Sequence, residues 1–558
     1  MMGGYIVAYY TYGKFLGKKI FKLAADNVCP SHELQDDIDF VPTNKHILFG
    51  HHFTSIAGLG PIVGPAVAII WGWVPAVLWV LFGSIFIGAV HDLGALVVSL
   101  RHQGRSIGDL SADIINHRVR TLFLLIIFFL LLLVISVFAL VIAILFTMYP
   151  QAVIPVWIEV PIAVWLGYMI YKKNGNHLTL SIFAVVLMYL FVVVGAYMPV
   201  DLKMFGLSDS NVLIVWMMIL FAYAYIASTL PVQTLLQPRD YINSHQLFIA
   251  LTLLIAGVLL SRPEIVAPVY DASPAGAPPV WPFLFVVIAC GAVSGFHSLV
   301  SSGTSSKQCY SEKDARFIGF GSMLMEGSLS TLVIIAVAGG IGLGLKTGTG
   351  EILTGTAAFT HHYASWAAVT GLGAKIGAFV QGSSNMIAAC GIPENITMTI
   401  MGVFIVSFAA TTLDTATRLQ RYIIGELATA YKLPFLAGRH PATILAVISA
   451  FGLAFYNGSG KGALILWPLF GTVNQLLGAM ALLVITIYLS KQRISIKFTV
   501  IPMVFMIIMT GWAMLLNLTA YINDQNWLLS GIGTMVFILE IWMIIEAVLY
   551  VCNNRTRH

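Results

Sequence analysis

The sequence predicts an all-α polytopic membrane protein of about 15 transmembrane helices, in which ten central helices form two inverted repeats of five. Hydrophobic residues make up 58% of the 558 residues and charged residues only 9%, whereas a soluble domain carries about 25% charged residues. Long apolar runs follow one another along most of the chain, and the lysines and arginines gather in alternate loops. Two of the runs contain residues that interrupt a helix.

A membrane-spanning helix needs about 20 predominantly apolar residues, and runs of about this length are taken here in chain order. A shorter run near 4–16 comes first. The others lie near 54–71, 73–99, 119–147, 152–172, 178–199, 211–231, 246–262, 281–301, 317–345, 396–414, 441–456, 462–489, 495–518 and 528–551.

The basic residues orient these runs. With the N-terminus outside, 23 of the 29 lysines and arginines lie on the inner side and five on the outer side, and Lys14 lies within the first run. Lysine and arginine accumulate in cytoplasmic loops. We therefore expect a multi-pass protein of the cytoplasmic (inner) membrane with its N-terminus outside and its C-terminus inside.

The first long run contains a segment that breaks helices. Five of the eight residues from Gly58 to Pro65 are glycine or proline. A broken helix leaves backbone N–H and C=O groups unpaired, which is tolerated in a membrane only where protein or a water-filled cavity surrounds them. Such breaks hold the substrate of secondary transporters, so we predict substrate contacts at Gly58, Gly60, Pro61 and Gly64. The alternative is a kink or a packing face of small residues.

A second interruption is predicted in the run near 211–231, where Ser228 is followed closely by Pro231. An anionic substrate suits the free N–H groups at the start of a half-helix. This second run is expected to form the opposite wall of the site, through Tyr223, Tyr225 and Ser228.

The two interruptions divide the chain into inverted halves. Five runs lie in 54–199 and five in 211–414, and the two sets start on opposite sides of the membrane. Broken helices at corresponding places of inverted halves indicate an alternating-access transporter. The expected organisation is an N-terminal helix and cytoplasmic segment (1–53), a ten-helix transport core (54–414), and a cytoplasmic linker with four C-terminal transmembrane helices (415–558).

The stretch 351–395 does not have the composition of a single transmembrane helix. It is dense in glycine, serine and threonine and contains Lys375. If it crossed the membrane, Arg418 and Arg421 would lie outside. We expect an outer re-entrant or interfacial region. The alternative is an ordinary structured outer loop, although long loops are often functional.

Ionisable residues at membrane depth are costly and mark functional sites. Burial favours the neutral form of a carboxyl group, which can then exchange a proton. The predicted proton-coupling residues are Glu326, Asp92, Asp414 and His297. For Asp414 the alternative is a structural ion pair with Arg418, four residues later on the same helix. Glu159 is expected near the outer end of its helix, in contact with solvent.

His51 and His52 lie at the inner mouth of the first break and are predicted to act in gating, together with Lys307. Histidine can carry protons or bind metals near neutral pH. Adjacent residues on a helix point in different directions, so this pair makes a poor metal site. No metal site is predicted, and zinc is kept as the alternative.

Six segments carry a family resemblance: DDIDFVPTNKHILFGHHFTSIAGLGPIVGP (Asp36–Pro65), SLRHQGRSIGDL (Ser99–Leu110), LPVQTLLQPRDYIN (Leu230–Asn243), SGFHSLVSSGTSSKQ (Ser294–Gln308), MLMEGS (Met323–Ser328) and TTLDTATRLQRY (Thr411–Tyr422). They resemble the carbon starvation protein A (CstA) family over about residues 30–430. The last four runs are similar only in general character. The resemblance implies an inner-membrane nutrient importer, in a family associated with peptide uptake under carbon limitation and with proton-coupled pyruvate uptake.

The resemblance also implies the LeuT-type fold with its five-plus-five inverted repeat. In that fold, hydroxyl groups near the end of one helix join carbonyls of the first broken helix to hold a sodium ion. The residues expected to take this part here are Ala57, Ser301, Ser302, Thr304 and Ser305. The alternative is helix packing by small residues. The lack of a neighbouring acidic residue in the sequence favours proton coupling, or a site in which Lys307 takes the place of the ion.

The sequence therefore predicts a secondary active transporter and not an enzyme. We expect it to import peptides or small carboxylates such as pyruvate with protons, under carbon limitation. The alternatives are a sodium-coupled symporter of the same fold and a gated channel. The inner segments are too short for a separate catalytic domain. The expected partners are a small-molecule substrate and the lipid bilayer, with no nucleic acid and no cofactor other than the coupling ion.

Overall fold

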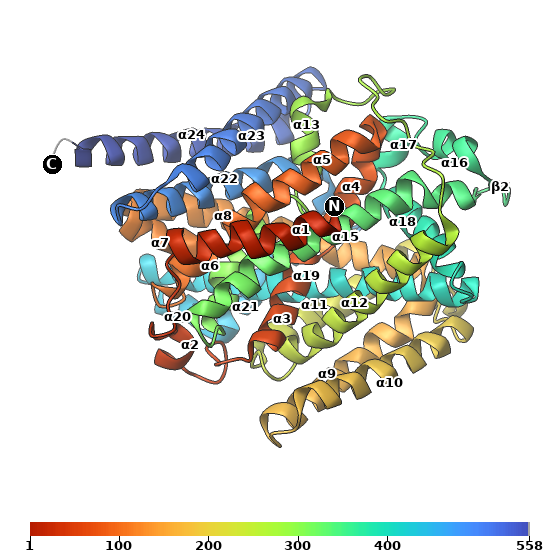
Figure 1. Ribbon diagram of the computed structural model, residues 1–558, viewed down its shortest axis with the longest axis horizontal. Coiled ribbons are helices and arrows are strands. Elements are labelled where there is room, and N and C mark those ends of the chain that lie inside the picture. Colours follow the sequence, from red (N-terminus) through yellow and green to blue (C-terminus); the bar gives the residue numbers. More distant parts are fainter. Residues whose placement is uncertain (556–558) are drawn as a thin grey trace.

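The computed structural model describes residues 1–555, and this part of the chain is a packed assembly of long helices (Figure 1). Within these residues, eleven helices are long and apolar enough to cross a membrane. A further pair, α3 (Lys45–Ala57) and α4 (Gly60–Ala68, continued to Trp71), passes the same test together and is bent by 42° at a break. The chain is thus a multi-pass membrane protein. The exact count of 15 crossings stays a prediction.

The helices of membrane length follow the apolar runs. They are α5–α6 (Trp73–Leu100), α8 (His117–Met148), α9 (Val153–Tyr171, preceded by a turn from Pro150), α10 (His177–Tyr197), α11 (Asp209–Thr229), α12 (Leu236–Ser261), α15 (Ser322–Ala338, within the longer helical stretch Glu312–Leu343), α19 (Glu394–Ala430), α22 (Trp467–Lys491), α23 (Lys497–Asn523) and α24 (Trp527–Arg555).

Shorter helices complete the chain. They are α1 (Met2–Ala8, continued by π-helical turns to Ile20), α2 (Pro30–Glu33), α7 (Ile107–Ile114), α13 (Val280–Val287), α14 (Gly295–Gly303), α16 (Gly355–His362), α17 (Trp366–Thr370), α18 (Leu372–Ala388), α20 (Pro434–Ala437) and α21 (Arg439–Phe455). The strands β1 (Leu345–Lys346) and β2 (Ile352–Leu353) form an antiparallel pair.

Polar residues between the apolar runs determine where several helices begin. Asn44, Asn116, Asn176 and Ser208 each precede a helix and accept hydrogen bonds from backbone N–H groups of its first turn. Such caps satisfy donors that have no partner within the helix. The starts of α3, α8, α10 and α11 therefore follow directly from the sequence.

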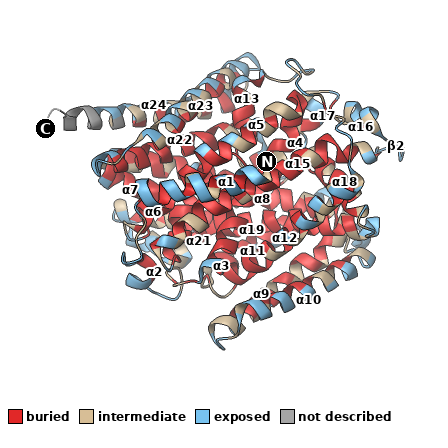
Figure 2. Cartoon of the chain, in the orientation of Figure 1, coloured by how far each residue is buried: buried red, intermediate tan, exposed pale blue. Residues whose placement is uncertain are grey.

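The centre of the molecule is formed by α8 and α19, which pack along each other, with α11 and α21 against them. These central helices are mostly buried, and exposed residues lie around them (Figure 2). The helices α9 and α10 pair with each other at one edge, and α24 extends away from the body at the opposite side (Figure 1).

The predicted second interruption is wrong in its position. The helix α11 is continuous from Asp209 to Thr229, and the chain leaves it in an extended conformation at Leu230, before Pro231. The second broken helix is instead formed by α13 and α14, which are separated by the unwound residues 288–294. Within them Gly291 has a φ of +89°, a conformation that glycine adopts without steric cost.

The stretch 351–395 is structured, as the sequence suggests, and it packs onto the broken helix. Its main helix, α18, contacts α4, α12 and α15. The Tyr363 hydroxyl donates a hydrogen bond to the carbonyl oxygen of Ala66 in α4. That this region lies on the outer side stays a prediction.

Two glycines of α18 provide a test of this packing. A Cβ atom on Gly382 would lie 2.1 Å from the carbonyl oxygen of Ala336, whereas a Cβ on Gly377 would meet no described atom within 4 Å. Gly377→Ala should raise stability by up to about 1 kcal/mol through helix propensity. Gly382→Ala should lower it by about 1–3 kcal/mol, because the backbone must move. Thermal unfolding of both variants in detergent measures this, and equal shifts would contradict the packing.

Candidate functional site

The two broken helices meet at their breaks. The helix α3 ends at Ala57, Gly58 departs from helical geometry, and α4 begins at Gly60. A Cβ atom on Gly60 would lie 2.3 Å from the side chain of Cys290, and one on Gly64 would lie 2.5 Å from the carbonyl oxygen of Val287. Only glycine permits so close an approach. We call this meeting of α4 with residues 287–294 the junction.

Side chains from neighbouring helices pair with backbone groups at the junction. Glu326 accepts from the N–H of Gly291 at 3.0 Å, and Ser330 donates to the carbonyl of Pro61 at 3.1 Å. Trp79 donates to the carbonyl of Ile288 at 3.0 Å. These bonds satisfy groups that an intact helix would pair internally. The break is therefore held by protein, as irregular backbone at membrane depth requires.

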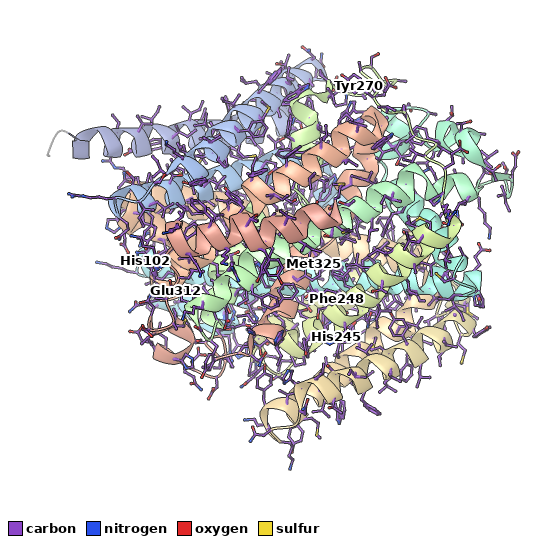
Figure 3. The ribbon with its side chains drawn as sticks, viewed as in Figure 1. His102, His245, Phe248, Tyr270, Glu312 and Met325 are labelled. Atoms are coloured by element: carbon purple, nitrogen blue, oxygen red, sulfur yellow. The ribbon has the colours of Figure 1, made fainter. Side chains whose placement is uncertain are left out.

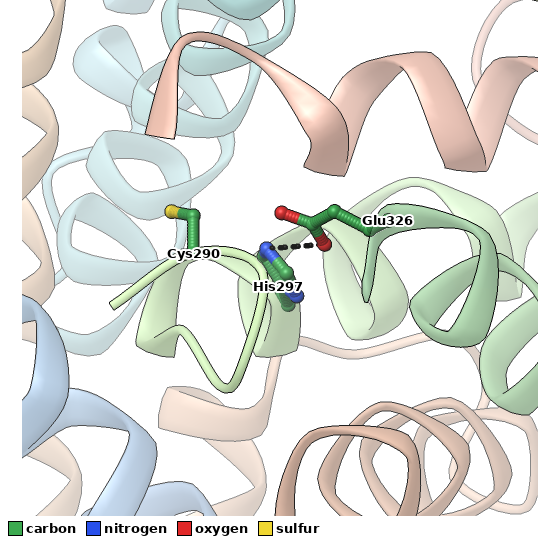
Figure 4. A group of neighbouring side chains, drawn as sticks. All are labelled: Cys290, His297 and Glu326. Atoms are coloured by element: carbon green, nitrogen blue, oxygen red, sulfur yellow. Dashed lines mark ion pairs between the residues drawn. The ribbon is translucent and has the colours of Figure 1, made fainter. Parts of the chain in front are cut away.

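Three of the predicted proton-coupling residues lie together beside the junction. Nδ1 of His297 in α14 lies 3.1 Å from a carboxylate oxygen of Asp92 in α6, and Nε2 lies 3.3 Å from Oε2 of Glu326 in α15 (Figure 4). His91 contacts the other Asp92 oxygen at 2.8 Å. All four side chains are buried. Their proposed part in proton coupling stays a prediction.

Cys290 adds a thiol to this group. Its sulfur atom, a ring nitrogen of His297 and a carboxylate oxygen of Glu326 all lie within 4.8 Å of one another. The three side chains are drawn together in Figure 4. These three residues could hold a metal ion, although no metal site was expected from the sequence. The sequence analysis missed Cys290 because the segment around it is apolar. The flanking Gly291 and Gly295 were the available signal.

A second buried charge cluster surrounds Arg239 of α12 and includes the fourth predicted residue, Asp414. Nη1 of Arg239 lies 2.5 Å from Asp414 and 2.6 Å from the hydroxyl of Tyr223, which donates to Asp414 at 2.8 Å. Nε of Arg239 lies 3.5 Å from Glu159 of α9. We call these residues the Arg239 cluster.

The expectation for Glu159 is wrong. Its side chain is fully buried and accepts a hydrogen bond from Ser407 at 3.1 Å. The sequence shows that Glu159 is near one end of an apolar run, but it does not show that α12 and α19 pack against its side chain. The alternative for Asp414, an ion pair with Arg418, is also wrong. Asp414 forms its ion pair with Arg239.

The predicted gating histidines connect α3 to other elements. His51 pairs with Asp240, the neighbour of Arg239, and its Nε2 lies 3.2 Å from the hydroxyl of Thr304. Nδ1 of His52 lies 2.7 Å from the hydroxyl of Ser305. Both histidines are buried. Their part in gating stays a prediction.

A third charged group joins the segment before α3 to α19, and we call it the Asp39 seal: Asp39, Arg418, Arg421 and Tyr422. Asp39 accepts from Arg418 at 2.6 Å, from Arg421 at 2.8 Å and from the hydroxyl of Tyr422 at 2.7 Å. Lys307, a predicted gating residue, lies 3.7 Å from the centre of the Tyr422 ring. Burial would raise the pKa of Asp39, but Arg418 and Arg421 hold it below its usual range. Asp39 was missed although it stands in a recognised motif.

Several predicted residues lie away from the junction. The hydroxyl of Tyr225 lies 3.0 Å from His440 at the edge of α21, and Ser228 is buried near the end of α11. This follows from the wrong position of the second break. The residues that lie against the start of α4 are instead in the segment 287–294.

Two of the predicted ion-binding hydroxyls, those of Thr304 and Ser305, contact His51 and His52 of α3. Ser302 accepts from the N–H of Ile107 at 2.9 Å, and Ser301 is buried. The hydroxyl group close to the first break, just after Ala57, comes instead from α19, since a Cβ on Gly58 would lie 2.4 Å from Oγ1 of Thr412. Ion binding by the predicted set stays a prediction.

A large apolar groove, separate from the junction, lies between α1, α3, α12 and α15. It has a volume of about 850 Å³, and its walls include His245, Phe248 and Met325 (Figure 3). The residues of the junction and of the Arg239 cluster do not line it.

Comparison with known proteins identifies the family of this chain. Residues 1–513 match the family described as "Carbon starvation protein CstA". The chain belongs to the CstA family. It is 32% identical to the "Peptide transporter CstA" of Campylobacter jejuni, over 91% of this chain and 78% of that protein. It is also 32% identical to the "Pyruvate/proton symporter BtsT" of Escherichia coli, over 92% and 80%. These CstA-family relatives are transporters and not enzymes.

Solved structures show the fold of this CstA-family chain in other proteins. A mutant manganese transporter of Eremococcus coleocola superposes with a TM-score of 0.52 at 12% sequence identity, covering 93% of this chain and 99% of that one. The likeness concerns the fold alone.

The close approach at the junction can be tested at Gly64. Gly64→Val should reduce transport at least about tenfold, because the new side chain pushes against the backbone of α13, while the amount of protein in the membrane stays unchanged. Gly452→Val in α21 is the control, since a Cβ there meets no described atom within 4 Å. Uptake per amount of membrane protein measures the effect. Normal uptake by the Gly64 variant would contradict the junction as the transport site.

The chain just after Asp39 pairs with the segment that ends at Cys309, through Val41 and Thr43. The Asp39 seal can therefore be tested by the reactivity of the buried thiols Cys309 and Cys29. Asp39→Asn should speed their labelling by a maleimide about tenfold or more, because removing one partner of a buried ion pair costs about 3–5 kcal/mol. Since the pKa of Asp39 lies below its usual range, the seal keeps its charge above about pH 4, and the ratio of rates should not change between about pH 5 and 8. Exposed Asp37→Asn is the control; equal rates for both variants would refute the seal.

Proposed function

We propose that this chain is a secondary active importer of small carboxylates or peptides in the cytoplasmic membrane, with its N-terminus outside and its C-terminus inside. The observation that carries the proposal is the junction, at which two broken helices face each other in the centre of a membrane protein of the CstA family. The names of the relatives, a peptide transporter and a pyruvate/proton symporter, support these substrate classes. A role under carbon limitation belongs to the same proposal.

The transport core is proposed to be an inverted repeat of the LeuT type, with a division that differs from the one expected from the sequence. The first repeat contains α3–α4, α5–α6, α8, α11 and α12, and the second contains α13–α14, α15, α19, α21 and α22. The packing supports this division because corresponding pairs make equivalent contacts: α4 with α15 and α14 with α6, α3 with α12 and α14 with α22, α8 with α11 and α19 with α21. The hairpin α9–α10 is then an insertion.

The substrate carboxylate is proposed to bind at the start of α4, near Gly60 and Pro61. The N-terminal end of a helix carries a partial positive charge that attracts anions, and here the N–H of Gly60 is the one offered, because Pro61 has none. The unwound residues 288–294 form the facing wall. A peptide and a monocarboxylate share this carboxylate, so the junction suits both classes of substrate.

The coupling ion is proposed to be a proton, held in the Arg239 cluster. Glu159 and Asp414 lie beside the guanidinium group of Arg239, and the neighbouring Asp240 pairs with His51. Glu159 and Asp414 each keep one carboxylate oxygen that has no hydrogen-bond partner among the described residues. A buried carboxylate without a paired charge is costly, so a proton stabilises the cluster. His51 links it to α3, one of the two halves at the break.

A sodium ion is the second candidate for coupling. The specific observation is that Thr412 approaches Gly58 and that the hydroxyls of Ser55 and Thr415 lie 3.1 Å apart. Sodium prefers oxygen ligands, and carbonyls at a helix break supply them. In this case, the ion would sit between α3 and α19.

Uptake into proteoliposomes tests the proposal. Labelled pyruvate and a labelled dipeptide are offered under a pH gradient and, separately, under a sodium gradient. We expect accumulation driven by protons, and Glu159→Gln should reduce this accumulation at least about tenfold while leaving exchange of internal and external substrate largely intact. Glu540→Gln is the matched control, because Glu540 is a buried carboxylate in α24, outside the core.

Other results of the uptake experiment would indicate sodium coupling or a channel. Accumulation driven by sodium and unaffected by Glu159→Gln would replace the proton by sodium. Flux that never runs against a concentration gradient would indicate a channel and reject the importer.

A further inference from the structure

Two ligand-type atoms at the junction are buried, close together and without hydrogen-bond partners among the described residues. They are Nε2 of His297 and Oε2 of Glu326, which lie 3.3 Å apart. The two atoms are close enough for an ion pair when His297 is protonated (Figure 4), but the contact lacks the geometry of a hydrogen bond. In a tetrahedral zinc site with ligand bonds of about 2.0–2.1 Å, ligand atoms are separated by about 3.3 Å. The arrangement is the one expected of two atoms directed at a common ion.

The other nitrogen of His297 and the other carboxylate oxygen of Glu326 each have a partner in the protein. Nδ1 of His297 pairs with Asp92 at 3.1 Å, and Asp92 is in turn held by His91 at 2.8 Å. Oε1 of Glu326 accepts from the N–H of Gly291 at 3.0 Å. Metal-binding histidines almost always use their second nitrogen in this way, which fixes the tautomer and the direction of the ring. This outer layer leaves only Nε2 and Oε2 available to a ligand.

Cys290 supplies a third donor from the unwound segment. Its sulfur lies within 4.8 Å of the other two ligand atoms. The Cys290 side chain also lies against the start of α4, because a Cβ atom on Gly60 would be 2.3 Å from it. A set of one nitrogen, one oxygen and one sulfur suits zinc and similar transition metals, and not the hard cations magnesium and calcium. Three protein ligands leave one position of a tetrahedron open.

We propose that Cys290, His297 and Glu326 bind one divalent transition-metal ion of the zinc type, with its open position toward the start of α4. The ion joins the unwound segment, α14 and α15 at the junction. The open position accepts a carboxylate oxygen of the substrate, and this last step rests on the proposed function. The ion binds to the Cys290 thiolate, so the thiol proton is released to water.

Cobalt(II) is a spectroscopic probe for this site in the full-length purified protein. Wild-type protein with one equivalent of cobalt(II) should show the intense absorption of a cobalt–thiolate bond and the visible bands of tetrahedral cobalt. Zinc(II) should displace it. Cys290→Ser should lose the thiolate band, and Cys390→Ser, which changes a free cysteine outside the junction, should keep it.

The outer layer gives a second variant that leaves all three ligands in place. Asp92→Asn should keep the cobalt–thiolate band but weaken cobalt affinity about 10–100-fold. Thermal unfolding shows whether each variant is folded. The proposal is overturned if folded wild-type protein gives no thiolate band, or if the band survives in Cys290→Ser. If the band is absent and Glu326→Gln loses proton-driven uptake, the metal site is rejected, and the predicted role of Glu326 in proton coupling is supported instead.

The open position is tested by adding pyruvate or a dipeptide to the cobalt-loaded protein. A change in the visible bands supports binding of the carboxylate to the ion, and unchanged bands overturn this step while leaving the metal site. Intact bands in a protein that fails every uptake assay would reject the proposed function and not the metal site. The two proposals therefore fail separately.

Discussion

The structure depends on the close approach of two backbones that are both unwound at membrane depth. This approach is possible only where no side chain intervenes, which explains why Gly60 and Gly64 face Cys290 and Val287. The lost helical hydrogen bonds are replaced by side chains from two other helices, Trp79 of α5 and Glu326 and Ser330 of α15. Because unpaired backbone groups in hydrocarbon cost several kcal/mol each, these side chains stabilise the break.

The charged residues of the interior are arranged in relation to the breaks. The group of Asp92, His297 and Glu326 lies beside the second break, and the Arg239 cluster lies beside the helix that leads into the first. Each group combines residues from at least three helices, so neither could form from local sequence alone. A charge at such depth is expensive unless it is paired, and the pairing links helices that are distant in sequence.

The helix positions could be predicted because a span requires a continuous apolar run, and the polar caps at Asn116 and Asn176 mark where α8 and α10 begin. The first break could be predicted because glycine and proline are concentrated there. The second could not, because residues 288–294 are apolar and add to the hydropathy of a span while their backbone is unwound. The partners of Glu159 were also out of reach, since hydropathy gives the depth of a residue in the membrane but not its neighbours.

The neighbouring residues Arg239 and Asp240 of α12 show how the interior can transmit a change of charge. Adjacent side chains on a helix point in different directions. Arg239 faces Asp414 and Glu159 on α19 and α9, whereas Asp240 faces His51 on α3. Any displacement of α3 away from α12 separates His51 from Asp240 and leaves a buried carboxylate without its partner, which is strongly unfavourable. In the proposed proton-coupled mechanism, a proton that neutralises Asp240 removes this penalty, which links proton binding to the position of α3.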